Sequence, residues 1–178
     1  MLCVAALAGC DTQTESKTSA SPDSVATVKD GVLDLDKSTT VGRAFDGFRY
    51  FSTKTWTHTT TENGRKLVEV TGTVDLSKLT SEDIAAATAN AFGPSANTAQ
   101  SDATLRNAQR QLKSAQFVFR FVLNLDNTFE LKEGKMILLR ADGKSVLTPV
   151  DGEYTLKEIY EGRLPDALLS SILLAGAQ

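Results

Sequence analysis

One run of alternating residues sets the architecture of this chain. Between positions 116 and 125, every second residue is large and apolar: Phe117, Phe119, Phe121, Leu123 and Leu125. The residues between them include Arg120 and Asn124. Such alternation is typical of an antiparallel strand that buries one face. The sequence therefore predicts a sheet with one face in the core, and other segments must cover that face.

Turn signals on both sides of this run predict further strands. Asn63-Gly64 separates residues 53–61 from 65–74, and Asp142-Gly143 lies just before residues 145–150. Both dipeptides favour the tight turns of β-hairpins. Three more strands are expected at residues 25–35, 129–131 and 136–140. The first has a kink or a turn at Asp30-Gly31, and Glu133-Gly134 is interpreted as a turn between the other two.

Helices are predicted from capping residues and from apolar residues at helical spacing. The expected ranges are 41–48, 80–92, 102–114, a short helix from Thr155, and a last helix from Pro165. Thr39 or Thr40 would cap the first range and Thr80 the second. Thr155 and Glu158 fit a capping box. The last segment carries a stripe of Leu and Ile residues, and we expect it to dock onto the core.

Antiparallel strands with segregated helices indicate the α+β class. We expect an antiparallel sheet of about five to seven strands packed by several short helices. Hydrophobic residues make up 41% of the chain and charged residues 23%, which is ordinary for a globular domain. The net charge of −3 gives no basic field for nucleic acid.

The N-terminal segment carries a motif, Leu7-Ala8-Gly9-Cys10. It ends a short apolar run, and residues 11–24 contain no apolar residue larger than Ala. The motif resembles the lipobox of bacterial lipoproteins, which implies a diacylglycerol joined to the Cys10 sulfur and attachment to a membrane through lipid. No Lys or Arg precedes Cys10. We therefore expect a signal-peptide remnant at residues 1–9, a lipidated disordered tether at 10–24 and a single α+β domain at 25–178.

Catalytic chemistry has little support in the sequence. His58 is the only histidine, and it lies within an expected strand, so an exposed or edge-strand histidine is favoured over a general base. Besides Cys10 the only cysteine is Cys3, in the signal-peptide remnant. No nucleotide-binding or nucleophile motif is present. We predict no catalytic, cofactor-binding or metal-binding residues.

Two weaker candidates remain. Asp34 and Asp36 would share one strand face and could bind a hard cation, although solvated acids are the simpler interpretation. Four aromatic residues could form a platform for sugar or protein, although core packing is favoured for at least half of them. These residues are Trp56, Tyr50, Phe51 and Tyr154.

The sequence favours a non-enzymatic envelope lipoprotein that faces the periplasm or the extracellular side. Its domain would bind, inhibit or structurally support an envelope protein. Two alternatives stay open: a tethered cell-wall or carbohydrate hydrolase with a carboxylate pair, and a binder of small ligands or peptides. The expected architecture also loosely resembles the helix-plus-sheet domains of the outer-membrane assembly lipoprotein and β-lactamase-inhibitor types. Neither family's functional motif can be placed on this chain.

Overall fold

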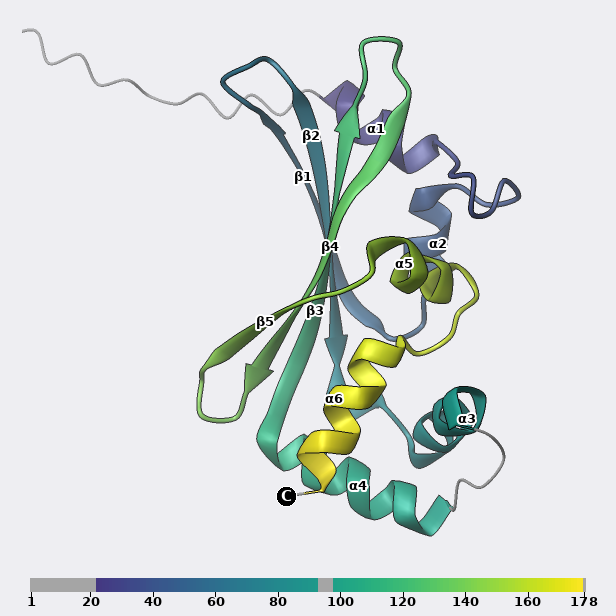
Figure 1. Cartoon of the computed structure of the whole chain (residues 1–178), viewed down its shortest axis with the longest axis vertical. Helices are drawn as coiled ribbons and strands as arrows, with labels where there is room; N and C mark the ends of the chain where they lie inside the picture. Colours follow the sequence, from purple (N-terminus) through teal and green to yellow (C-terminus); the bar gives the residue numbers. More distant parts are fainter. Residues whose placement is uncertain (1–21, 93–97, 178) are drawn as a thin grey trace, which may run out of the picture.

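The structure, a computed structural model, describes residues 22–92 and 98–177. Its centre is one five-stranded antiparallel sheet in the order β1-β2-β3-β4-β5 (Figure 1). The strands are β1 (Phe51–Thr60), β2 (Lys66–Asp75), β3 (Leu112–Leu123), β4 (Phe129–Arg140) and β5 (Ser145–Pro149). Each strand pairs with its neighbour in sequence, so the sheet is a meander. The predicted α+β class is confirmed.

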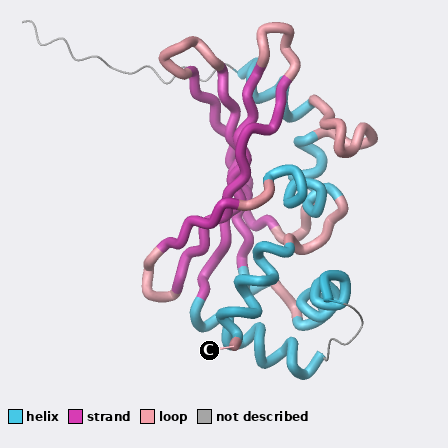
Figure 2. The backbone as a smooth tube through the Cα atoms, viewed as in Figure 1, coloured by secondary structure: helices cyan, strands magenta, loops and turns pink. Residues whose placement is uncertain are grey.

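The helices lie on one side of this sheet (Figure 2). They are α1 (Pro22–Asp30), α2 (Val41–Gly47), α3 (Ser81–Phe92), α4 (Thr98–Gln111), α5 (Gly152–Tyr160) and α6 (Asp166–Gly176), with a short 3-10 turn η1 (Leu76–Lys78) after β2. Within the described ranges, no helix or strand packs on the opposite side. We therefore distinguish a covered face of the sheet, under the helices, from an open face.

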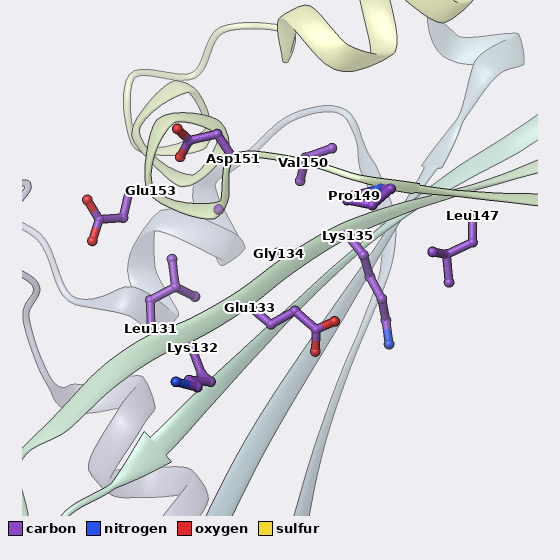
Figure 3. Close-up of a pocket in the computed structure, with 11 residues that line it drawn as sticks. Leu131, Lys132, Glu133, Gly134, Lys135, Leu147, Pro149, Val150, Asp151 and Glu153 are labelled. Carbon is purple, nitrogen blue, oxygen red and sulfur yellow. The ribbon is translucent and has the colours of Figure 1, made fainter.

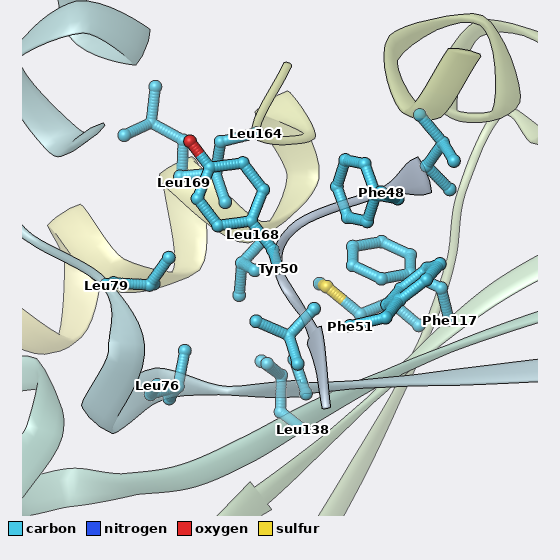
Figure 4. Close-up of a cluster of buried hydrophobic side chains, with 14 of the residues drawn as sticks. Phe48, Tyr50, Phe51, Leu76, Leu79, Phe117, Leu138, Leu164, Leu168 and Leu169 are labelled. Carbon is cyan, nitrogen blue, oxygen red and sulfur yellow. The ribbon is translucent and has the colours of Figure 1, made fainter. Parts of the chain in front are cut away.

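The core lies between the covered face and the helices. Phe117, Phe119 and Phe121 of β3 are fully buried there, as the alternating pattern predicts. The Phe45 ring of α2 packs edge-on against Phe119, with 5.7 Å between ring centroids. Apolar side chains of β3 and of the C-terminal helix contribute to the same cluster (Figure 4). Burial of each such side chain contributes about 1.5–3 kcal/mol to folding.

Several local predictions are confirmed. Thr40 caps α2, because its side-chain oxygen accepts a hydrogen bond from the Arg43 backbone N–H at 3.2 Å. Gly64 and Gly143 have φ angles of 75° and 84°, which is why glycine suits these two hairpin turns. The apolar stripe of α6 docks onto the core, with Leu168 and Ile172 fully buried.

The start of the domain differs from the prediction. Residues 25–30 form part of α1 rather than a strand. Pro22 opens this helix, where a missing N–H costs nothing, and Val28 is fully buried at helical spacing from Val25. The loose alternation at 25–35 concealed this periodicity. The last three residues of the segment expected to be a tether, 22–24, belong to α1.

The second half of the sheet also differs. Glu133-Gly134 makes no turn, and β4 runs unbroken from Phe129 to Arg140. Phe121 pairs with Leu131 and Arg120 with Glu133, so one extra residue on β4 forms a β-bulge there. Bulges absorb an extra residue without ending a strand, which explains why the local turn signal was wrong.

The boundaries of α4, β3 and α5 are corrected as well. α4 begins at Thr98 and ends at Gln111, so residues 112–114 belong to β3 rather than to a helix. Leu125 lies beyond β3 and is fully exposed. α5 begins at Gly152, and its cap is Asp151 rather than Thr155. The Asp151 carboxylate accepts a hydrogen bond from the Tyr154 backbone N–H at 3.0 Å.

Candidate functional site

The candidate site arises where β5 leaves the sheet. β5 pairs only with residues 135–139 of β4, and a last backbone hydrogen bond joins Val150 N–H to the Gly134 carbonyl at 3.3 Å. Residues 129–133 of β4 pair with β3 on one side. On the other side, no described strand lies next to them. Almost half of β4 is therefore an unpaired sheet edge.

The backbone groups at this edge point outward. Asn124 N–H donates to the Thr128 carbonyl at 2.8 Å, so Thr128 faces β3. Because the direction alternates along an antiparallel strand, the N–H and C=O groups of Phe129 and Leu131 point away from β3. Neither residue forms an outward backbone hydrogen bond within the described part of the chain. These groups are available to another strand.

Two adjacent cavities lie along the unpaired edge, and we call them together the edge groove. Their volumes are about 410 Å³ and about 420 Å³, and they share Leu131 and Glu153 as lining residues. Figure 3 shows the first cavity, with β4 side chains on one side and Asp151 and Glu153 opposite them. Each cavity falls in the size range of ordinary ligand sites.

The connection from β5 to α5 forms one wall of the edge groove. Pro149 ends β5, and Asp151 caps α5, so the chain changes direction within two residues. The first turn of α5 passes close over Gly134, where β4 has no side chain to obstruct it. This crossing holds Glu153 beside the edge of β4.

Acidic residues dominate the lining of the edge groove. Five carboxylates and two lysines line the two cavities: Asp34, Glu130, Glu133, Asp151, Glu153, Lys132 and Lys135. Asp34 pairs with Lys37 at 3.1 Å. Glu130 and Glu153 are exposed, and neither has an ion pair with a described residue. The lining therefore carries more negative than positive charge, with Lys132 and Lys135 among the acids.

Glu133 is held by a network on the open face. Arg120 lies at the centre of this face and donates to Glu133 and to Glu69, each at 3.0 Å. The two bonds join three neighbouring strands. They direct the Glu133 carboxylate toward Arg120, so Glu130, Asp151 and Glu153 are the acids of the groove for which no ion pair with a described residue is found.

The structure places His58 away from the edge groove. Its side chain faces the helices from β1 and is 8% exposed, and neither ring nitrogen has a hydrogen-bond partner among the described residues. A general base needs an orienting partner and a nucleophile within hydrogen-bond reach. Within the part of the chain that the structure describes, His58 has neither. It is a buried residue of the edge strand β1, so the edge-strand interpretation is confirmed and an exposed histidine is not.

Asp34 and Asp36 do not share a strand face. They lie between α1 and α2 in a turn that a bridge between Leu33 and Asp36 closes. Asp36 accepts hydrogen bonds from the Ser38 side chain and N–H, which lower the pKa of its carboxyl. The described residues contain no group of three or more His, Cys, Asp and Glu side chains arranged to hold a metal.

The four aromatic residues do not form one platform. Phe51 and Tyr50 are buried, and Trp56 packs edge-on against Phe45 at 5.6 Å. Tyr154 is exposed on α5, and its hydroxyl donates to Asp166 at 2.9 Å. The favoured interpretation, core packing for at least half of them, is confirmed. Cys10, the predicted lipidation site, lies outside the described residues.

Sequence reasoning missed the role of Glu158. Its capping-box position predicted a bond to the first turn of α5, but its carboxylate accepts from the N–H of Asp166 at 3.1 Å, at the start of α6. Burial is the main cause that raises the pKa of Glu158 to about 7, although Arg163 lies 3.8 Å away. Glu158 is fully buried and lines neither cavity of the edge groove, so its role is to position α6.

Known proteins add no assignment to this geometry. Comparison with known protein families, with curated proteins and with solved structures gave no significant match. In the described ranges no helix has the length and apolar character to span a membrane. The edge groove and the N-terminal motif are therefore the two features of the chain that bear on its function.

Proposed function

We propose that this chain is a lipid-anchored cell-envelope lipoprotein whose domain is a non-enzymatic protein-binding module, with the edge groove as its binding surface. The unpaired half of β4 is the observation that carries the proposal. Exposed strand edges are templates for pairing with another chain, and proteins normally cover or block them. Here the outward groups of Phe129 and Leu131 lie beside two cavities instead.

The anchor and the localisation rest on the lipobox resemblance at Cys10. Lipid attachment would hold the domain at the envelope. Two acyl chains anchor a protein stably, whereas one chain gives marginal binding. We propose an envelope protein as the partner, in addition to the membrane.

The hydrolase alternative has less support. It would need two acids facing one cavity, one of them with a raised pKa. Glu158 has the raised pKa, but it is buried among the helices and caps α6. Binding of a small ligand in one cavity is the second alternative, and the cavity volumes suit it. The continuous free edge favours a polypeptide instead.

The proposal is tested by crosslinking in the envelope of the producing organism, with the full tagged chain as bait. Leu131→Pro removes an outward N–H and leaves the β3 ladder bonds in place. Thr60→Pro is the matched control, because Thr60 ends the opposite edge strand β1 and by alternation also points its N–H outward. We expect one crosslinked partner with the native chain and with Thr60→Pro, and none with Leu131→Pro.

Folding of both variants is checked by thermal melting. If Leu131→Pro melts early, amide hydrogen exchange on the native chain replaces it: partner binding should slow exchange at Phe129 and Leu131. Equal recovery of the partner with both folded proline variants would rule out the edge groove as the binding surface.

A further inference from the structure

We propose that the edge groove takes an extended peptide segment that alternates apolar and basic residues and adds to the sheet as a strand beside β4. This inference rests on the proposed function, because it names the chemistry of the partner that the same groove would accept. Backbone pairing, an apolar wall and an acidic rim each point to this occupant.

Backbone hydrogen bonds would hold the occupant at the edge of β4. The outward N–H and C=O groups of Phe129 and Leu131 are spaced two residues apart, which is the repeat of a pairing strand. A peptide that pairs there satisfies all four groups at once. Peptide recognition by strand addition gains affinity from these main-chain bonds and specificity from alternate side-chain positions.

The length of the occupant follows from the crossing at Gly134. β5 fills the edge at residues 135–139, and α5 passes over Gly134 immediately beyond. Residues 129–133 remain free, which gives room for a strand of about five residues, or roughly 17 Å. The added strand would end where α5 begins.

Apolar side chains of the occupant would point toward the covered face. On that side the edge groove is lined by Leu33 and Leu35 of the α1–α2 turn and by Phe129 and Leu131 of β4. All four are only partly buried by the rest of the domain, so they offer apolar surface to a ligand. Alternate residues of a strand point to opposite faces, so the remaining side chains would face the open side.

Basic side chains suit the acidic rim of the groove. Glu130 lies on the open-face side of β4, where the remaining side chains of the occupant would point. Glu153 and Asp151 lie on the α5 wall, on the helix side of the edge, and add to the negative charge beside the occupant. Opposite charges on directly facing strand residues stabilise the pairing, and like charges oppose it. A peptide lysine or arginine beside Glu130 would therefore be favoured over an acidic residue.

A second copy of this chain is a poorer occupant. A symmetric contact places the same surface patch on both subunits, so the acid-rich rim would face itself. The whole chain also carries a net charge of −3, which adds to the repulsion between copies. The chemistry of the groove favours a different, cationic polypeptide.

The experiment uses two capped nonapeptides, one alternating valine and lysine and one alternating valine and glutamate, added to the full chain. Binding is measured by fluorescence anisotropy, and amide exchange is followed residue by residue. We expect the valine–lysine peptide to bind and to slow exchange at Phe129 and Leu131 about tenfold. The valine–glutamate peptide should bind about tenfold more weakly.

A charge variant localises the effect. Glu130→Gln should lower the affinity for the valine–lysine peptide about two- to fivefold, the range for one cross-strand ion pair. Glu82→Gln removes the same charge at an exposed position in the first turn of α3 and should leave the affinity unchanged.

Three outcomes would overturn the proposal: equal binding of both peptides, peptide binding without protection of Phe129 and Leu131, or a concentration-dependent dimer that protects these amides without peptide. The proposed function has a separate readout. If Leu131→Pro abolishes the crosslinked partner but neither peptide binds, the edge groove stands as the binding surface and only the chemistry of its occupant is wrong.

Discussion

Gly134 and Gly152 are in backbone contact: a Cβ atom added at Gly134 would lie 2.6 Å from the Cα atom of Gly152. Side-chain carbons do not approach other carbons so closely in folded proteins, so the contact requires glycine at position 134. The pair fixes where α5 crosses β4. It therefore also sets the end of the edge groove.

Gly134→Ala is expected to destabilise the domain by about 1–3 kcal/mol, because the added methyl group must push α5 away from β4. Gly47→Ala is the control, since a Cβ there meets nothing within 4 Å and alanine favours the helix. Urea unfolding measures both. A native-like free energy of unfolding for Gly134→Ala would show that α5 shifts freely at the crossing.

Ile172→Ala tests how much the C-terminal helix contributes. Ile172 is fully buried, so its truncation should cost about 2–5 kcal/mol through lost apolar contact and a residual cavity. Leu174 lies two residues further along α6 and is 69% exposed, so Leu174→Ala should change stability by about 0.5 kcal/mol or less. Similar costs for the two variants would contradict the docked position of α6.

Glu158 should make stability depend on pH. Its folded pKa of about 7 lies above the ordinary value of 4.5, so between these values the folded state binds the proton more tightly than the unfolded state. The resulting stabilisation is complete below about pH 4.5 and is lost as the pH rises through about 7. Its size is on the order of 2–3 kcal/mol.

Glu158→Gln should remove this pH dependence, because the amide stays neutral and can still accept the hydrogen bond from Asp166. The free energy of unfolding of the native chain should fall between pH 5 and 8, whereas that of the variant should stay nearly level across the same range. Glu82→Gln, at an exposed position of α3, should keep the native slope. Parallel curves for the native chain and Glu158→Gln would assign the pH dependence to other groups.

Cys10→Ala tests the anchor. If Cys10 carries the lipid, this variant should move from the membrane fraction to the soluble fraction, because no acyl chain would hold it. Cys3→Ala removes the other cysteine and should leave the protein with the membranes. Fractionation with carbonate washing provides the measurement, and an unchanged distribution of Cys10→Ala would refute the lipid anchor.

The sequence predicted those parts of the fold in which local chemistry agrees with the tertiary structure. The Phe117–Leu123 alternation identified the central strand because Phe117, Phe119 and Phe121 are fully buried on its covered face. The turns at Gly64 and Gly143 need positive φ, which glycine adopts without strain. Residues 25–30 were misassigned because only Val25 and Val28 mark the buried side of α1, too few to distinguish a helix from a strand.

The edge groove could not be predicted, because Gly134 fits a turn pattern in the sequence but has a different role in the structure. Gly134 follows Glu133 in a pattern typical of a turn, yet it is glycine because Gly152 passes over it. With a turn placed there, β4 becomes two short strands, and no unpaired edge remains. Pro149 does indicate where β5 ends. That this end leaves part of β4 unpaired follows only once β4 is known to extend from Phe129 to Arg140. Glu158 shows the same limit, since its pattern indicated a cap but not which helix it would cap.

The meander has a consequence for how the chain folds. Short turns close the β1–β2, β3–β4 and β4–β5 pairs, whereas η1, α3 and α4 separate β2 from β3. Loop closure costs more entropy as the loop lengthens, and non-local pairing slows folding. A two-stranded and a three-stranded hairpin unit can therefore form independently, each from nearby sequence. We expect the pairing of β2 with β3 to be the step that limits the folding rate.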